Sequence, residues 1–427
     1  MMSRLISNDG KQGIHYGFVI ITMGTIVVVG ALGFARFGYT MILPVMQHGL
    51  LLSSTEMGFL AAGNLIGYLV FSFLGGILAS KYGPKIVITC SLFVCGLAMI
   101  GTGFTQGFAL AFILRLITGL GSGGSNVPMM GLASSWFSQR RRGMATGLMS
   151  GGSGIGLVLV GLVLPRIFAY YGEWGWRLGW YMLGGLVILI GLLGAKFLVN
   201  RPQELGLEPV GGENQADKKS SVSSLQWSLV FRSRTIWLLG TIYFLFGFSY
   251  IIYSTFFASF LVDERGLLES TAGNLWALVG ILSIFSGLLW GIFSDRFGRR
   301  SGLVAIFLLQ FSSFLIFSLT FDFSGYLISS ILFGLTAWSI PGVMAATIGD
   351  HLGGKLAPAG LGMVTLVFGI GQALGPAISG FLADLTASFS LAFLLAAMGA
   401  LLGAFISLFL KLHRPGYTDE NMVGSKQ

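Results

Sequence analysis

The sequence has 427 residues, of which 54% are hydrophobic and only 10% are charged, and its mean hydropathy is +0.83. Soluble domains use roughly 25% charged residues, so a water-soluble fold of this length could not bury so much apolar surface. The composition excludes an ordinary soluble protein. The net charge of +9 comes from basic residues dispersed over short polar breaks, which does not indicate a nucleic-acid partner.

Long charge-poor runs recur along the chain, and each is long enough to cross a hydrocarbon core of about 30 Å as a helix. The runs are continuous rather than alternating, which favours helices over a barrel. About twelve spans are predicted, and they begin near Tyr16, Thr55, Ile86, Phe108, Gly143, Trp176, Arg234, Thr271, Gly302, Ser324, Pro358 and Phe389. The predicted fold class is therefore an all-α membrane protein with about twelve transmembrane helices.

The distribution of Lys and Arg predicts the orientation, because positive residues in short loops stay in the cytoplasm. The opening segment has no short apolar core followed by a cleavage site, so we expect a cytoplasmic tail rather than a signal peptide. With the N-terminus inside, the same side carries Lys81, Lys85, Arg140, Arg141, Arg142, Arg296, Arg299, Arg300 and Lys355. We expect a multi-pass protein of the inner (plasma) membrane with both termini cytoplasmic.

The longest polar stretch between spans divides the chain into two parts. Residues 201–233 are rich in Gly, Ser and charge, which predicts a cytoplasmic linker between an N-terminal six-helix bundle, 1–200, and a C-terminal bundle with its tail, 234–427. One ungapped offset of 215 residues places Gly76–Lys85 on Gly291–Arg300 and Gly147 on Gly362. A shared register of this kind indicates an internal repeat.

The repeated segment carries a family resemblance. GIFSDRFGRR, residues 291–300, resembles the loop signature of the major facilitator superfamily, which lies between the second and third helices of each half. The first copy, GILASKYGPK, has Ser80 where the signature has an acid, and RLITGLG around Arg115 also matches. The resemblance implies the major facilitator fold and transport of a small solute by alternating access.

Two other segments resemble one branch of this superfamily. GLGSGGSNVPMMGLASSWFSQRRRGMATG and RPQELGLEPVGG are similar to the bacterial oxalate/formate and monocarboxylate transporters. Members commonly have an Arg in the eighth span before the signature, whereas this chain has Gly287 and apolar neighbours there. The segment GFARFGY also resembles a poorly characterised bacterial branch. An organic anion such as a monocarboxylate is the expected substrate, and export of lipophilic compounds is the alternative.

The repeated loops predict a conformational latch. Glycines there let two helix ends approach and turn sharply, and Asp295 is expected near a helix start, paired with Arg residues. The candidate latch residues are Gly76, Gly83, Gly291, Asp295, Arg296, Gly298 and Arg299. An ordinary set of positive loops is the alternative explanation.

Arg36 is the clearest candidate for contact with a solute, because an ionisable residue deep in a span is costly. It lies roughly 30 Å from the Tyr16 end of the first span at 1.5 Å per residue, and Tyr39 and Thr40 are expected on its face. Arg36 could instead reach the headgroups, and Arg115 could be structural. The full set of candidates is Arg36, Tyr39, Asn64, Arg115, Asn126, Tyr253 and Gln372.

Several features are missing from the sequence. No Asp or Glu lies at mid-depth in a span, so a coupled proton has no obvious carrier. Nucleophile, metal and nucleotide motifs are absent too, so we expect neither an enzyme nor a cofactor, and Cys90 and Cys95 are expected to be packing residues. The expected partners are the lipid bilayer, a small solute and, as a candidate, a co-transported proton, with the chain working as a monomer.

Overall fold

The computed structural model describes residues 15–212 and 232–410, almost entirely as helix. The first half contains α1 (Tyr16–Val28), η2 (Val29–Phe37), α2 (Gly38–Leu50), α3 (Ser54–Tyr82), α4 (Pro84–Gly103), α5 (Phe108–Trp136), α6 (Gln139–Ser150), α7 (Gly152–Tyr171), η3 (Gly172–Trp174), α8 (Gly175–Phe197) and η4 (Pro202–Leu205). The second half contains α10 (Arg234–Ser259), η6 (Phe260–Glu264), α11 (Glu269–Phe297), α12 (Arg299–Leu319), α13 (Phe323–Thr336), α14 (Ser339–Thr386) and α15 (Ser390–Ser407).

The helices make twelve passes through a membrane. Eleven stretches of the described residues are long and apolar enough to span, and one of them, Arg141–Phe197, has 57 residues. A helix of that length would measure about 85 Å, far more than the hydrocarbon core, and this stretch turns back at η3. It therefore supplies two passes. Helix α14 contains a break at Gly353, whose φ is +68°, and its two parts belong to two different passes. The predicted fold class is confirmed.

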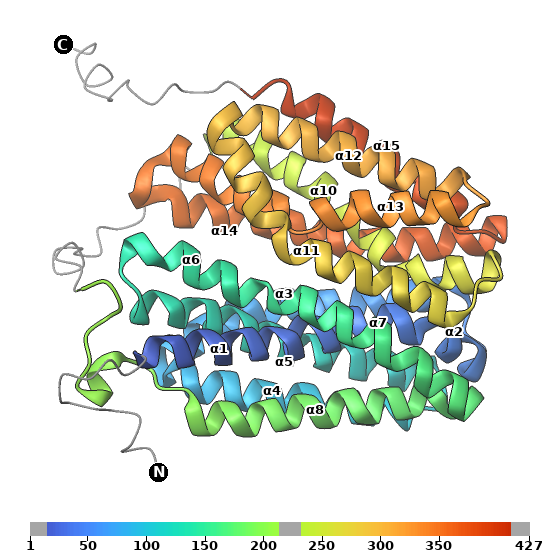
Figure 1. The fold of residues 1–427 in the computed structure, drawn as a ribbon, viewed down its shortest axis with the longest axis horizontal. Helices are drawn as coiled ribbons and strands as arrows, with labels where there is room; N and C mark the ends of the chain where they lie inside the picture. Colours follow the sequence, from blue (N-terminus) through green and yellow to red (C-terminus); the bar gives the residue numbers. More distant parts are fainter. Residues whose placement is uncertain (1–14, 213–231, 411–427) are drawn as a thin grey trace.

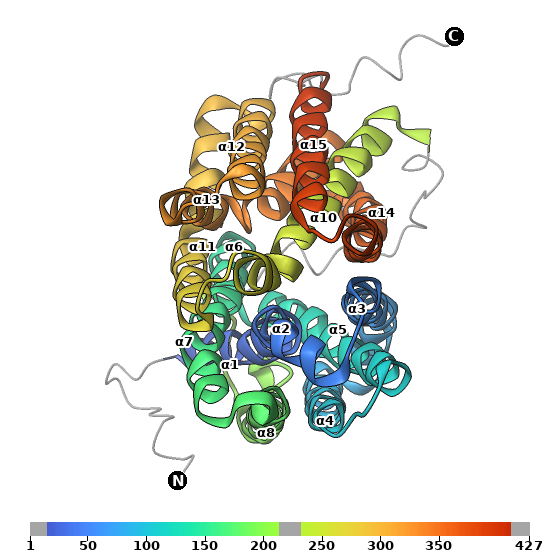
Figure 2. The same ribbon diagram turned by 90° about the vertical axis from the view of Figure 1, so that its right-hand side faces the viewer.

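The two halves form two bundles, α1–α8 and α10–α15, which lie one below the other in Figure 1. Figure 2 shows the same two groups end-on. We call one end of the molecule the basic face, which carries Lys81, Lys85, Arg141, Arg296 and Arg300, and the other the acidic face, which carries Asp263, Glu264, Asp322 and Asp384. The first helix starts at the basic face, on the left of Figure 1.

Close contacts between the halves lie toward the acidic face. A Cβ added to Gly58 would lie 2.2 Å from the carbonyl oxygen of Pro376, and one added to Gly380 would lie 2.1 Å from that of Ser54. Toward the basic face, a Cβ on Gly147 or on its repeat partner Gly362 would meet no atom of the described residues within 4 Å. The backbones of the two halves touch at the acidic face, whereas glycines at the basic face border open space. The halves are therefore closed at the acidic face and apart at the basic face.

The start of the predicted linker packs on the first half. The Val210 amide donates to the carbonyl of Trp136 at 2.9 Å, and the Ser138 amide donates to the carbonyl of Val210 at 3.1 Å. The segment therefore covers the turn between α5 and α6. Residues 213–231 and both predicted tails lie outside the described residues, and the division at 200/201 and 233/234 stays a prediction.

The latch loops are sharp turns at two glycines. Gly83, between α3 and α4, has φ +88°, and Gly298, between α11 and α12, has φ +94°, a conformation that only glycine adopts readily. At Gly76 and Gly291 the expected close approach is not present, because a Cβ there would meet nothing within 4 Å. The halves are apart at this face, so no second helix packs against these positions.

The expected location of Asp295 is wrong. This residue lies in the last turn of α11 rather than near a helix start, where a carboxylate meets the unfavourable end of the helix dipole. Its charge is offset by Arg299, which bonds Asp295 and also donates to Asp350 on α14 at 2.9 Å. Arg296 points elsewhere, with its guanidinium 5.6 Å from the Phe297 ring centroid. The acidic network thus joins three helices within the second half.

In the first-half loop, the neutral Ser80 occupies the repeat position of Asp295. The Ser80 hydroxyl donates to its own helix, at the Gly76 carbonyl, over 3.0 Å. The Lys85 amide instead donates to the Asn200 side chain at 2.8 Å, so the segment that follows α8 caps the start of α4. The two repeats therefore reach the same turn with different chemistry.

Candidate solute site between the two halves

The first membrane pass is interrupted by a π-helix, η2, between α1 and α2. Its sequence, VGALGFARF, contains two glycines, which lower the preference for α-helix. Gly33 lies against α7, where an added Cβ would be 2.6 Å from the Cα of Gly156. Short π segments inside α-helices are uncommon and often occur at functional sites. Arg36 lies in the last turn of this segment.

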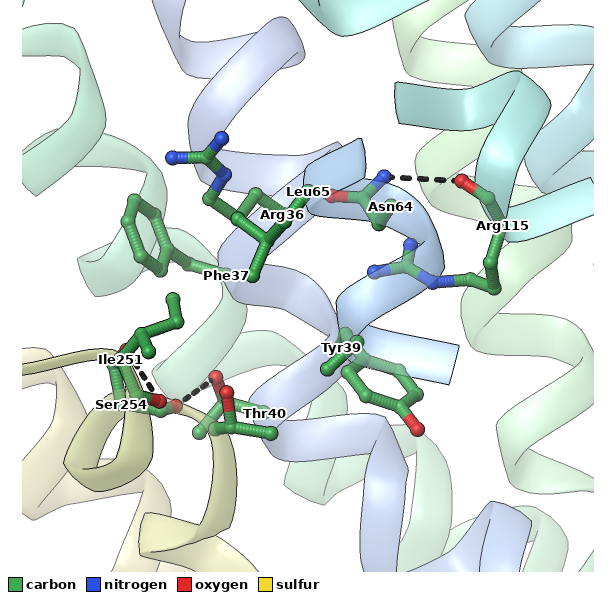
Figure 3. A pocket seen from close by; sticks show the side chains of 11 residues that line it. Arg36, Phe37, Tyr39, Thr40, Asn64, Leu65, Arg115, Ile251 and Ser254 are labelled. Carbon is green, nitrogen blue, oxygen red and sulfur yellow. Dashed lines mark hydrogen bonds between the residues drawn. The ribbon is translucent and has the colours of Figure 1, made fainter. Parts of the chain in front are cut away.

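A small, open pocket lies beside η2 (Figure 3). Its lining residues come from both halves and are Arg36, Phe37, Tyr39, Thr40, Ala61, Asn64, Leu65, Arg115, Ile251, Ser254 and Thr255. This lining includes two arginines and no carboxylate. The local charge is therefore positive.

The Arg36 guanidinium lies between the two halves without a hydrogen-bond partner for two of its nitrogens. Nε and Nη2 are both buried and unpaired, although the residue as a whole is partly exposed. The guanidinium carbon lies 4.3 Å from the centroid of the Tyr68 ring on α3. The guanidinium also interacts electrostatically with the hydroxyl of Tyr250, which lies on α10 of the other half. Arg36 therefore has aromatic neighbours but unused donors.

Each of these two tyrosines is held by an amide side chain from its own half. Asn126 on α5 donates to the Tyr68 hydroxyl at 2.9 Å, and its own Oδ1 is buried without a partner. Gln372 on α14 donates to the Tyr250 hydroxyl. Three of the predicted site residues, Arg36, Asn126 and Gln372, are thus brought to one place by the two tyrosines.

Arg36, Tyr39 and Thr40 all line the pocket, but their polar groups do not converge as the expected cradle requires. The Tyr39 hydroxyl donates to the Met57 carbonyl at 2.9 Å, and the Thr40 hydroxyl donates to the Ser254 carbonyl at 2.5 Å. In Figure 3 the Arg36 guanidinium points away from both side chains. Helical spacing of three and four residues does not hold across η2, because its turns are wider than those of an α-helix.

Arg115 and Asn64 lie deeper in the first half. Arg115 is only 1% exposed, and its guanidinium carbon lies 4.6 Å from the Tyr39 ring centroid and 5.2 Å from that of Trp180. Its Nη1 donates to the Ala35 carbonyl at 2.8 Å, while Asn64 donates to the carbonyl of Arg115 at 3.3 Å. Both residues line the pocket, but the hydrogen bonds that they donate are to backbone carbonyls of neighbouring helices.

Tyr253 is placed in the aromatic core of the second half. It is 0% exposed, and its hydroxyl lies 2.9 Å from the Ser329 hydroxyl. Its ring centroid is 4.3 Å from that of Phe333, and neither residue lines the pocket. Tyr253 is therefore not brought to the other candidates.

Sequence reasoning missed Tyr68, Tyr250 and Trp338. Trp338 precedes α14, its Nε1 is buried without a partner, and its ring centroid lies 5.0 Å from that of Phe37 and 5.9 Å from that of Tyr250. Tyr68 stands four positions after Asn64, on the same helix face, which was an available signal. Nothing in the sequence distinguishes Tyr250 from Tyr253 as a residue that faces the other half.

Comparison with known proteins identifies the family. The family described as "Uncharacterised MFS-type transporter YbfB" matches residues 28–408. The hexuronate transporter of Bacillus subtilis is 27% identical over 264 residues, which cover 60% of each chain. The probable sulfoacetate transporter SauU of Cupriavidus necator is 25% identical over 273 residues, which cover 62% of each chain. The matched region thus spans about 60% of these relatives' length.

Solved structures share the fold along nearly the whole chain. A bacterial homologue of the human lysosomal transporter Spinster, in an inward-facing and unoccupied conformation, superposes with a TM-score of 0.70 at 16% identity and covers 93% of this chain and 96% of its own. The nucleoside transporter NupG gives a TM-score of 0.71 at 14% identity and covers 90% of this chain and 97% of its own. The superfamily resemblance is confirmed, whereas the oxalate/formate branch stays a prediction. The chain belongs to the YbfB family of MFS-type transporters, and its long apolar helices are those of a multi-pass membrane protein.

Proposed function

We propose that this transporter carries a small organic anion and that Arg36 binds its acidic group. The observation that carries the proposal is the pair of buried, unpartnered guanidinium nitrogens in a pocket lined by no carboxylate. An unpaired charge away from water is costly, and a carboxylate can accept two parallel hydrogen bonds from a guanidinium. A bound anion therefore supplies the partner that Arg36 lacks.

The neighbours of Arg36 support binding between the halves. Tyr68 and Tyr250 approach it from opposite bundles, and each is oriented by an amide, from Asn126 and from Gln372. These polar groups can hold the uncharged part of a solute. The hexuronate and sulfoacetate named for two relatives are organic anions, which agrees with this substrate class. A monocarboxylate is the simplest member, and a sugar acid is a second.

The transport cycle that we propose is alternating access between the two bundles. With both termini in the cytoplasm, as the basic loops favour, the parted basic face is the cytoplasmic one of an inner membrane. A solute enters from that side, contacts both halves and is released after they close there and open at the acidic face. We propose one site and one working chain, with a proton as a candidate co-substrate.

The direct test is uptake into proteoliposomes of labelled lactate, pyruvate, formate, oxalate and glucuronate. Arg36→Ala is expected to lower kcat/KM at least tenfold, because it removes charge-assisted hydrogen bonds worth about 1.5–3 kcal/mol each. Arg36→Lys is expected to recover part of the loss, since a point charge remains but the fork is gone.

Arg166→Ala is the matched control. Arg166 donates to its own helix at the Leu162 carbonyl and does not line the pocket. Anion uptake that is equally fast in wild type and Arg36→Ala would show that the site assignment is wrong. Export of lipophilic dyes without uptake of any anion would replace the proposed substrate class with the alternative one.

A further inference from the structure

Two side chains of α5 donate hydrogen bonds to carbonyl groups of the π-helix. The Ser122 hydroxyl donates to the Ala31 carbonyl, and Arg115 Nη1 donates to the Ala35 carbonyl at 2.8 Å. Both donors are buried, with Ser122 at 0% and Arg115 at 1% exposure. The two bonds run between neighbouring antiparallel helices, so η2 is attached to α5 at two points, one near each of its ends.

The opposite side of the π-helix is fixed as well. Gly33 lies between the two alanines in the chain and contacts Gly156 of α7 so closely that no side chain fits between them. A π-helical turn is less stable than an α-helical turn, so outside partners for its carbonyls help to decide which form is populated. The α5 donors supply such partners, and the glycine contact leaves little space for the segment to shift.

The consequence for Arg36 follows from helix geometry. Arg36 comes directly after Ala35, whose carbonyl Arg115 binds. A return of this segment to α-helix would change the register by a residue, which turns a side chain by about 100° around the axis. That rotation would take the guanidinium away from Tyr68 and Tyr250, where it now lies between the halves.

We infer that Ser122, together with Arg115, is a positioning residue, which holds η2 in the π form and thereby keeps Arg36 directed into the space between the halves. The importance of this for transport rests on the proposed role of Arg36 in anion binding. Ser122 does not line the pocket, so it acts through the helix that it holds and not on the solute.

The first arm of the test measures the direction of position 36 without any substrate. In a chain with Cys90→Ser and Cys95→Ser, the reporter Arg36→Cys is labelled with a water-soluble methanethiosulfonate reagent. Adding Ser122→Ala is expected to slow labelling about fivefold, the effect of one net hydrogen bond. Adding Thr118→Ala is the control and should leave the rate unchanged.

Thr118 is a close match to Ser122. It lies one turn away on α5, is 0% exposed, and its hydroxyl donates to its own helix at the Leu114 carbonyl over 2.8 Å. Equal labelling rates with and without Ser122→Ala would overturn the inference. So would an equal slowing by Thr118→Ala, since any buried hydroxyl of α5 would then have the same effect.

Arg115 provides a second pair of variants in the same assay. Arg115→Lys keeps a cationic donor for the Ala35 carbonyl and should label close to the parent rate, whereas Arg115→Gln should label at least fivefold more slowly. If Lys and Gln have the same effect, bonding to the carbonyl is not what Arg115 contributes, and the inference fails for that residue.

The second arm measures lactate and glucuronate uptake in a double-mutant cycle. Ser122→Ala should raise KM about fivefold when Arg36 is present and have no further effect in an Arg36→Gln background, because it acts through Arg36. Additive losses would contradict the positioning role. If Arg36→Gln leaves uptake intact, the proposed function fails, while the labelling arm still decides whether Ser122 directs position 36.

Discussion

Asp384 holds the two halves together at the acidic face by capping a helix of the other half. Its carboxylate, at the end of α14, accepts hydrogen bonds from the Ser54 and Thr55 amides, each at 2.8 Å, and from the Thr55 hydroxyl. Helix α3 begins with four amides that lack partners in the helix. The Ser53 hydroxyl accepts from the Glu56 amide, and the Glu56 carboxylate accepts from the Ser53 amide. Asp384 therefore completes the cap only while the acidic face is closed.

The size of this contribution follows from the geometry of the cap. A side-chain cap contributes about 1 kcal/mol, and a carboxylate at a helix start adds about 0.5 kcal/mol through the helix dipole. Asp384 is exposed, so water replaces part of both terms when the halves separate. After this replacement by water, we expect Asp384→Ala to shift the balance between closed and open acidic faces by about 1 kcal/mol, or roughly fivefold, toward the open form.

Double electron–electron resonance can measure this shift between spin labels on Leu51 and Leu268, which are 90% and 73% exposed at the acidic face of the two halves. The matched control is Asp322→Ala. Among the described residues, the Asp322 carboxylate accepts hydrogen bonds from the hydroxyls of Thr320 and Ser324, which lie in the same loop. An unchanged distance distribution in Asp384→Ala, or an equal change in the control, would refute the reasoning.

The remaining predictions concern the latch and the π-helix. Asp295→Asn is expected to slow transport more than Ser80→Ala, because Asp295 bonds Arg299 across helices whereas Ser80 bonds only its own helix; equal uptake rates would contradict this asymmetry. Gly33→Ala should lower the thermal unfolding temperature, since its Cβ would lie 2.6 Å from the backbone of Gly156. A loss of about 1–3 kcal/mol is expected, and an unchanged melting temperature in detergent would show that the contact relaxes freely.

Composition and span length were enough to predict the fold, because in a bilayer every backbone polar group must be satisfied within a helix. The internal repeat added the division into halves and located the sharp turns at Gly83 and Gly298. The location of Asp295 near a helix start was predicted wrongly. Its position in the last turn of α11 depends on where the helix ends, and such boundaries are the least certain part of a sequence-based prediction.

The candidate site was harder to predict for a reason that Arg36 illustrates. Its depth in the first span could be read from residue counts, but the face that it occupies could not. Tyr39 and Thr40 line the same pocket, but their hydroxyl groups do not meet the guanidinium, because α-helical spacing fails across η2. The π form is maintained by contacts from Ser122 and Arg115, which are remote in the sequence. The residue spacing around Arg36 cannot predict hydrogen-bond donors that come from another helix.

The placement of Arg36 also bears on how the proposed cycle is driven. The polar contacts between the halves at the acidic face include those of Asp384 and a hydrogen bond between His48, which is 72% exposed, and Asp263; polar contacts at an exposed surface contribute about 1 kcal/mol or less. An anion that binds Arg36 between Tyr68 and Tyr250 touches both halves at once. Its binding free energy can therefore draw the basic ends together, working against both the polar contacts and the close helix packing that keep the acidic face closed.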